Sequence, residues 1–167
     1  MKMEDIALKT AKAALAFGLG ERDLLEADAN ERSITHKLAE YLQGVFPEWN
    51  VDCEYNRLGD KIKRLPAAQP SSTDDTQGRS IFPDIIVHRR RTNENLLVVE
   101  VKKTTNKLLG DEEKLCALTA DDGEFAYTLG LHVIFDCRKF CIETAIAYSH
   151  GTTNQEITSV LQRALSL

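Results

Sequence analysis

A proline–aspartate pair and a Glu-Val-Lys triplet are the residues of this chain best suited to chemistry. Pro83-Asp84 and Glu100-Val101-Lys102 lie in two short apolar segments, 81–88 and 96–102, which are rich in β-branched residues. A polar stretch at 89–95 separates the two segments, and this pattern predicts two strands joined as a hairpin. Two carboxylates and an amine therefore lie within strands that are otherwise apolar.

The alternation of side chains along a strand indicates which of these groups meet. If the hairpin closes symmetrically about Thr92, Asp84 faces Glu100 with their Cβ atoms roughly 4.5–5.5 Å apart. The same register gives two further cross-strand pairs, His88 with Leu96 and Ile86 with Val98. Like charges at this separation repel each other unless a cation compensates them. Mg²⁺ suits this role because it prefers one or two carboxylates, with water completing its shell.

The lysine two residues beyond Glu100 projects from the same face of the strand, beside the predicted cation. An ammonium group there orients a metal-bound water or stabilises the charge that develops on an attacked phosphodiester. In the alternative interpretation, Glu100 and Lys102 only end a strand as it reaches solvent, and Asp84 lies in a turn after Pro83. The combination of Pro-Asp, fifteen intervening residues and Glu-Val-Lys favours a functional site.

Pro83-Asp84 followed by Glu100-Val101-Lys102 resembles the motif of the PD-(D/E)xK nuclease superfamily, which has the restriction-endonuclease-like fold. The resemblance covers about residues 30–136 and implies an α/β domain whose mixed central sheet has about four to five strands flanked by helices. It implies metal-dependent hydrolysis of nucleic-acid phosphodiester bonds, with Mn²⁺ able to replace Mg²⁺. It also implies that the backbone carbonyl of Val101 is a further metal ligand.

A glutamate on the helix expected before the first strand is the fourth candidate. The sequence predicts a helix from an N-cap at Asp28 to about Val45, with Glu31 placed as in a capping box. Glu31 also falls within the apolar stripe of this helix, where a carboxylate needs a partner. Capping is one role for it. The family resemblance implies another, in which Glu31 binds a second metal or a metal-bound water.

The net charge of −5 argues against a protein that coats nucleic acid by bulk electrostatics. An enzyme that contacts nucleic acid transiently needs only a local basic patch. The candidate phosphate contacts are basic residues in short segments around the motif: Lys61, Lys63, Arg64, Arg89, Arg90, Arg91 and Lys103. A solvated loop is the alternative for each cluster. No aromatic residues are interleaved with them, so a platform for stacking single-stranded bases is not indicated.

The remaining sequence predicts one domain with no linker to divide it. The domain core is expected over about residues 28–148, preceded by a helix within 1–20. The other expected elements are a helix over 3–17 ending at Gly18 and Gly20, a strand over 49–55, a mobile loop over 59–80, a helix over 111–119, a strand over 131–136, a strand or helix start over 140–148 and a helix over 153–165. A strand–helix–strand order makes 96–102 and 131–135 parallel neighbours.

Three further residues receive expectations from their positions. Two positions stay open for Lys114: it assists at the active face near the ends of the central strands, or, as the favoured expectation, it faces solvent. His36 is predicted to face solvent, and His132 to lie on a strand surface or in the core. The four cysteines have no zinc spacing, so reduced, partly buried thiols are expected. No apolar run approaches the roughly 20 residues of a membrane span and no signal peptide is visible, so a cytoplasmic protein without a membrane segment is expected.

Several functional alternatives stay open at this point. The sequence does not distinguish DNA from RNA, because no base-reading module is present to decide. We take DNA as the expected substrate. A homodimer and a separate targeting protein are both compatible with the chain. The alternative function is a nuclease-like domain without turnover, which binds nucleic acid or protein as a regulatory subunit.

Overall fold

A computed structural model describes residues 1–55, 82–104 and 111–166, together with the backbone of four two-residue strands between 57 and 80. In this described part, six strands form one mixed, open sheet in the order β1-β6-β7-β8-β9-β10. Their bounds are β1 Asn50–Cys53, β6 Ile85–His88, β7 Asn95–Lys103, β8 Leu129–Asp136, β9 Cys141–Ser149 and β10 Thr152–Thr153. The β7 and β8 strands are parallel, as predicted, and the other neighbours are antiparallel.

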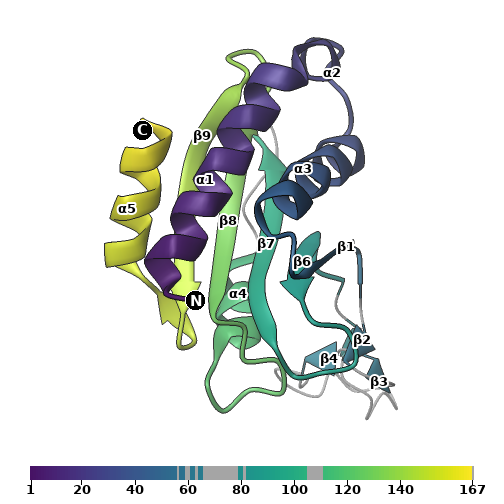
Figure 1. Cartoon of the computed structure of the whole chain (residues 1–167), viewed down its shortest axis with the longest axis vertical. Helices are drawn as coiled ribbons and strands as arrows, with labels where there is room; N and C mark the ends of the chain where they lie inside the picture. The colour runs from purple at the N-terminus through teal and green to yellow at the C-terminus, as the bar shows by residue number, and fades with distance from the viewer. Residues whose placement is uncertain are drawn as a thin grey trace, which may run out of the picture.

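Helices cover both faces of this sheet (Figure 1). The described helices are α1 Met3–Gly20, α2 Arg22–Glu26, α3 Glu31–Val45, α4 Asp111–Thr119 and α5 Gln155–Leu165. Three of them, α1, α3 and α5, pack on one face, and α4 lies on the other (Figure 1). The protein is therefore an α/β protein, and its sheet has one strand more than the largest number expected. The helices and strands predicted from sequence are present, and the segment expected over 140–148 as a strand or helix start is the strand β9.

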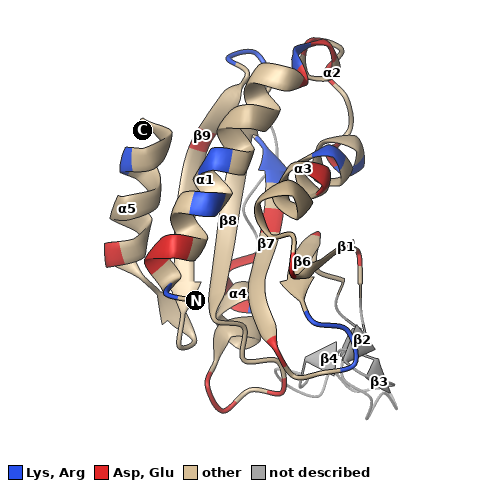
Figure 2. Cartoon of the chain, viewed as in Figure 1, with Lys and Arg blue, Asp and Glu red and all other residues tan. Residues whose placement is uncertain are grey.

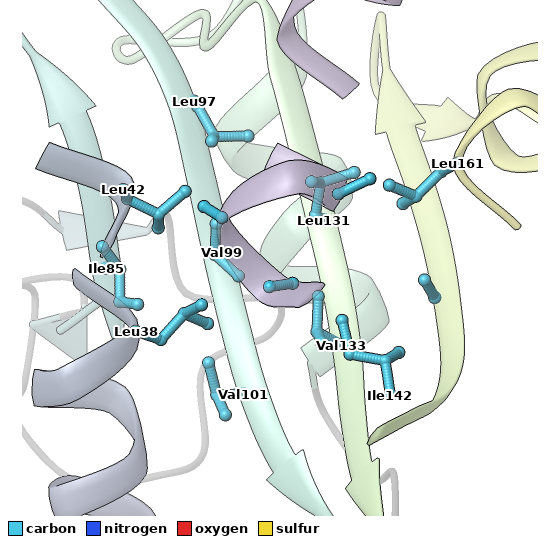
Figure 3. Close-up of a cluster of buried hydrophobic side chains, with 14 of the residues drawn as sticks. Leu38, Leu42, Ile85, Leu97, Val99, Val101, Leu131, Val133, Ile142 and Leu161 are labelled. Carbon is cyan, nitrogen blue, oxygen red and sulfur yellow. The ribbon is translucent and has the colours of Figure 1, made fainter. Parts of the chain in front are cut away.

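The strand β7 is apolar on both sides because both of its faces are covered. Leu97, Val99 and Val101 point into the larger cluster under α1, α3 and α5 (Figure 3). Val98 points the other way and packs against Leu115 and the rest of the smaller cluster under α4. Because side chains alternate between the two faces of a strand, Glu100 and Lys102 follow Val98 on the α4 side and lie near the end of β7.

The hairpin of β6 and β7 has the predicted register over most of its length. Ile86 pairs with Val98, as expected. The predicted pairing of His88 with Leu96 is wrong, because the register shifts after Val87 and His88 pairs with Asn95. The buried His88 ring places Nε2 2.8 Å from the carboxylate of Asp52 on β1, a tertiary contact that accompanies the bulge.

The helix α3 begins two residues later than predicted. Asn30 is the N-cap, since its side-chain oxygen accepts a hydrogen bond of 2.9 Å from the Ser33 N–H. The prediction of Asp28 as N-cap is therefore wrong, and Asp28 instead pairs with the ammonium of Lys103. Glu31 is therefore the first residue of the helix and does not hold the capping-box position. Its side chain instead accepts a hydrogen bond from the Lys103 N–H on β7.

The helix α1 continues through the glycine predicted to stop it. Gly18 lies inside α1, and a Cβ atom added there would be 2.6 Å from the carbonyl oxygen of Phe140. The expected helix stop at Gly18 is wrong, whereas the helix does end at the second predicted glycine, Gly20. Glycine is required there because the turn between β8 and β9 approaches the helix backbone closely.

Three general features complete the fold. Among the described helices, none combines the length and apolar character needed to cross a membrane. The cysteines, all within the described residues, are unpaired and half-buried: Cys53, Cys116, Cys137 and Cys141. Apart from short strands that pair as Arg57–Leu58 with Lys61–Ile62 and Arg64–Leu65 with Arg79–Ser80, the predicted mobile loop over 59–80 lies outside the described residues.

Candidate active site

Polar side chains gather where β7 ends, at the edge of the sheet where α4 begins. A helix that connects two parallel strands starts near the carboxyl end of the first strand, so α4 brings its first turns to this edge. The side chains come from four elements and one turn: Asp84 before β6, Glu100 and Lys102 on β7, Asp111 and Lys114 on α4, His132 on β8, and Glu31 on α3. The structure therefore brings the four sequence-predicted candidates into one region and adds three residues to them.

Glu100 is the most deeply buried member of this group, with only 1% of its surface exposed. Its Oε1 lies 2.7 Å from the Nζ of Lys114, which contacts the Phe82 carbonyl oxygen at 2.9 Å. Burial raises the pKa of Glu100 to about 7, and the nearby Asp84 carboxylate adds to this, whereas the Lys114 ammonium opposes it. The prediction that Lys114 faces solvent is wrong, because α4 turns this side chain towards the sheet.

Asp84 is hydrogen-bonded to the backbone of the Glu-Val-Lys triplet. Its Oδ2 accepts a hydrogen bond of 2.8 Å from the Val101 N–H. Asp84 precedes Ile85, which pairs with Val99, so the register of the hairpin places Asp84 across from Glu100. Burial raises the pKa of Asp84, and the hydrogen bond from Val101 counteracts part of that effect. Two carboxylates that both resist ionisation thus lie side by side.

The ammonium of Lys102 lies between acidic side chains from two helices. Its Nζ is 3.6 Å from Oδ2 of Asp111 and 3.8 Å from Oε2 of Glu31. These separations are too long for hydrogen bonds, and within residues 1–55, 82–104 and 111–166 no acceptor takes a hydrogen bond from this ammonium. Burial lowers the pKa of Lys102, but the carboxylates around it, led by Asp111, outweigh burial and raise the pKa above its ordinary value.

Glu31 reaches this region from the opposite face of the sheet. Its Oε1 accepts a long hydrogen bond of 3.4 Å from the Lys103 N–H. Glu31 and Asp84 line the same cavity of about 410 Å³, which has as its other walls Arg32, Thr35, His36, Cys53 and Glu54. Glu31 is therefore close to Lys102 and shares a cavity with Asp84, while its role towards a metal stays a prediction.

Asp111 and His132 belong to the same region and were not singled out from the sequence as site residues. Oδ2 of Asp111 and Nε2 of His132 lie 3.8 Å apart, and both atoms are buried without a hydrogen-bond partner among the described residues. Burial lowers the pKa of His132. A buried polar atom without a hydrogen bond costs about 1–3 kcal/mol, and for Asp111 the Lys102 ammonium, 3.6 Å from the same Oδ2 atom, offsets part of this cost by its charge.

A sequence signal for His132 did exist. It interrupts the apolar run of β8, and the parallel pairing places it beside Glu100. Once the two strands are expected to be parallel neighbours, a histidine inside the second strand becomes a candidate for the same face. Asp111 and Lys114 carry no comparable signal, because exposed helices are rich in charged residues.

The donor set can be compared with the needs of a magnesium ion. Among the described residues, no three or more His, Cys, Asp or Glu side chains are grouped so that they could hold a metal. Mg²⁺ needs only one or two carboxylates when water and a substrate phosphate supply the other oxygens. Asp84 and Glu100 meet this smaller requirement in chemistry, although the Lys114 ammonium lies against Glu100. The Val101 carbonyl as a ligand stays a prediction.

The arginines predicted to contact phosphate lie away from this site. Arg89 forms an ion pair with Glu94, and Arg90 forms a bidentate ion pair with Asp52. The basic segment after β6 lies at the far end of the hairpin from the end of β7 (Figure 2). Since Arg89 lies five positions after Asp84 along the extended chain, the distance between them is about 16 Å. A phosphate chain would have to extend along the hairpin to reach both.

The other predicted basic contacts divide into two groups. The Lys103 ammonium is bound to the Asp28 carboxylate and lies 3.1 Å from the Ala29 carbonyl oxygen, so it is engaged within the protein. Three predicted contacts have side chains outside the described residues: Lys61, Lys63 and Arg64. His36 agrees with its prediction, since 69% of its side chain is exposed.

Comparison with known proteins adds no assignment. No protein-family model matches the chain, and no curated protein matches its sequence.

Proposed function

We propose that the protein is a metal-dependent nuclease of the PD-(D/E)xK superfamily, with a restriction-endonuclease-like fold, that hydrolyses phosphodiester bonds in nucleic acid. The observation that supports this most is the hydrogen bond from the Val101 N–H to Asp84. It links the Pro-Asp pair to the Glu-Val-Lys triplet, so that the three side chains of the motif share one site. DNA is taken as the substrate to test first.

Asp84 and Glu100 would hold Mg²⁺, with the Val101 carbonyl and Glu31 as further oxygen ligands in the proposal. Mg²⁺ bound there supplies positive charge for a pentavalent phosphoryl transition state and acidifies bound water. Burial has already removed much of the hydration of both carboxylates, which favours their exchange of water for a cation.

Lys102 would act by charge and position rather than as a base. The surrounding carboxylates raise its pKa, so at neutral pH it is an ammonium with no lone pair to accept a proton. An ammonium held 3.6 Å from Asp111 and 3.8 Å from Glu31 makes a hydrogen bond to neither carboxylate, so towards these described neighbours its donors are available for a water or a phosphate oxygen. It would therefore orient the attacking water and stabilise charge on the phosphorus centre.

One observation favours the alternative, a nuclease-like regulatory domain without turnover. The Lys114 ammonium already compensates Glu100, so the buried carboxylate does not depend on a metal for its counter-charge. Against this alternative, all three polar motif residues are present and share the site, whereas a site free of selection for turnover would be expected to lose at least one of them.

Cleavage of a mixed substrate panel tests the proposal. The panel contains supercoiled, linear, single-stranded and branched DNA and RNA, each incubated with Mg²⁺, Mn²⁺ or EDTA. Wild type should cut at least one substrate only with metal, and Asp84→Asn should reduce the rate by roughly 100-fold or more. Asp121→Asn, at an exposed carboxylate paired with His150, is the matched control and should keep the wild-type rate. Undiminished cutting by Asp84→Asn, or no cutting together with no metal-induced rise in Tm, would refute the proposal.

A further inference from the structure

Lys114 occupies the position that a cation would take between the two strands of the motif. Its Nζ lies 2.7 Å from Oε1 of Glu100 on β7 and 2.9 Å from the carbonyl oxygen of Phe82, two residues before Asp84. Only 17% of the Lys114 side chain is exposed. The ammonium is therefore held by one carboxylate oxygen and one backbone oxygen, the two ligand types that hard divalent cations also prefer.

The need for such a cation follows from the burial of Glu100. A carboxylate with 1% of its surface exposed cannot be hydrated, and burial of an unpaired charge is strongly unfavourable. The neighbouring carboxylate of Asp84 increases the need for positive charge. Lys102 does not meet it directly, because the ion pairs of its ammonium are with Asp111 and Glu31. Lys114 is the described lysine that contacts Glu100.

We propose that Lys114 is a built-in counter-ion of Glu100 and that a divalent metal must displace its ammonium to bind. This inference rests on the proposed function, since it assigns a competitor to the proposed metal site. The ammonium of Lys114 already supplies the positive charge beside Glu100 that a bound metal would supply. Lys114 would thereby act as a positioning residue that sets the metal affinity.

Competition between two cations for one carboxylate has a measurable consequence. Metal binding to wild type must break the contact between Lys114 and Glu100, so part of the binding free energy is consumed by that exchange. Removing the ammonium should tighten binding, and couplings of this kind typically correspond to about 5- to 150-fold in affinity. Lys114→Arg keeps the positive charge and should keep the competition.

The experiment measures binding of Mg²⁺ and Mn²⁺ alone by calorimetry, without substrate. The variants are Lys114→Met, which removes the charge, and Lys114→Gln, which removes the charge but keeps an N–H donor if the first variant folds poorly. Both should bind either metal roughly 5-fold or more tightly than wild type. Lys114→Arg should bind within about 3-fold of wild type. Lys139→Met is the matched control, because this exposed lysine pairs with Asp136 and Glu143 and should bind metal as wild type does.

The outcomes distinguish the counter-ion role from the proposed nuclease function. Unchanged or weaker metal binding by both Lys114→Met and Lys114→Gln, with wild type binding metal, would overturn the counter-ion role and leave the proposed nuclease intact. Tighter binding by Lys114→Arg as well would also overturn it, because charge would then not be the cause. No metal binding by any form would overturn both proposals.

Discussion

Replacing Glu100 with glutamine should remove a pH dependence that this carboxyl imposes on folding. Burial raises the pKa of Glu100 to about 7, from an ordinary value of 4.5. In the unfolded chain the carboxyl loses its proton near pH 4.5, whereas the folded protein keeps the proton until about pH 7. The stabilisation is therefore complete below pH 4.5 and is lost as pH rises through 7.

The size of the effect follows from the two pKa values. A difference of one unit between the folded and unfolded pKa values corresponds to about 1.4 kcal/mol of stability. Between pH 4.5 and about 7, this group should thus lower the wild-type free energy of unfolding by about 3 kcal/mol. Asp84 contributes in the same direction, because its pKa is also raised by burial. Glutamine has the shape of the protonated acid and does not titrate.

Urea unfolding followed by circular dichroism, in EDTA and at about half-unit steps of pH from about 4.5 to 8, measures this difference. Glu100→Gln can shift the whole curve by leaving the Lys114 ammonium unpaired, so the decisive quantity is the slope with pH and not the offset. The exposed Glu124→Gln is the control and should follow wild type. Parallel curves for wild type and Glu100→Gln would refute the reasoning, since Glu100 would then titrate alike in both states.

Two further predictions concern stability. His132→Leu should raise the free energy of unfolding by about 1 kcal/mol, because the buried Nε2 has no hydrogen-bond partner among the described residues; a fall in urea unfolding experiments would show that it has one. Gly18→Ala should lower that free energy by about 1–3 kcal/mol, because the new Cβ would meet the Phe140 carbonyl oxygen. Gly44→Ala in α3 is its control, since nothing lies within 4 Å, and should stabilise by about 0.5–1 kcal/mol; equal effects on Tm would contradict the steric argument.

Much of the fold could be predicted because it depends on local pattern. Alternation and β-branched residues identify the hairpin, and the pairing of Ile86 with Val98 follows from its symmetry. The shift after Val87 could not be predicted in this way, because it accompanies the contact of His88 with Asp52 on another strand. Helix ends were less predictable, since an N-cap depends on which nearby side chain reaches the first N–H groups.

The site was predictable where its residues lie on the hairpin itself. Asp84 and Glu100 could be placed opposite each other because the alternation of side chains and a symmetric loop together define the register of the hairpin. Lys114 and Asp111 could not be assigned, because their direction depends on how α4 rotates over the sheet. That rotation is set by packing of residues such as Leu115 against Val98, which a single sequence does not reveal.

The most direct test of the nuclease account is the rate of Mg²⁺-dependent DNA cleavage by Lys102→Met. The account predicts a loss of roughly 100-fold or more with unchanged Tm, because methionine keeps the length of the side chain but removes the ammonium that lies between Asp111 and Glu31. Lys12→Met, at an exposed lysine on α1, should cleave as wild type does. Cleavage by Lys102→Met at the wild-type rate would contradict the account, because the motif lysine would then have no part in the reaction.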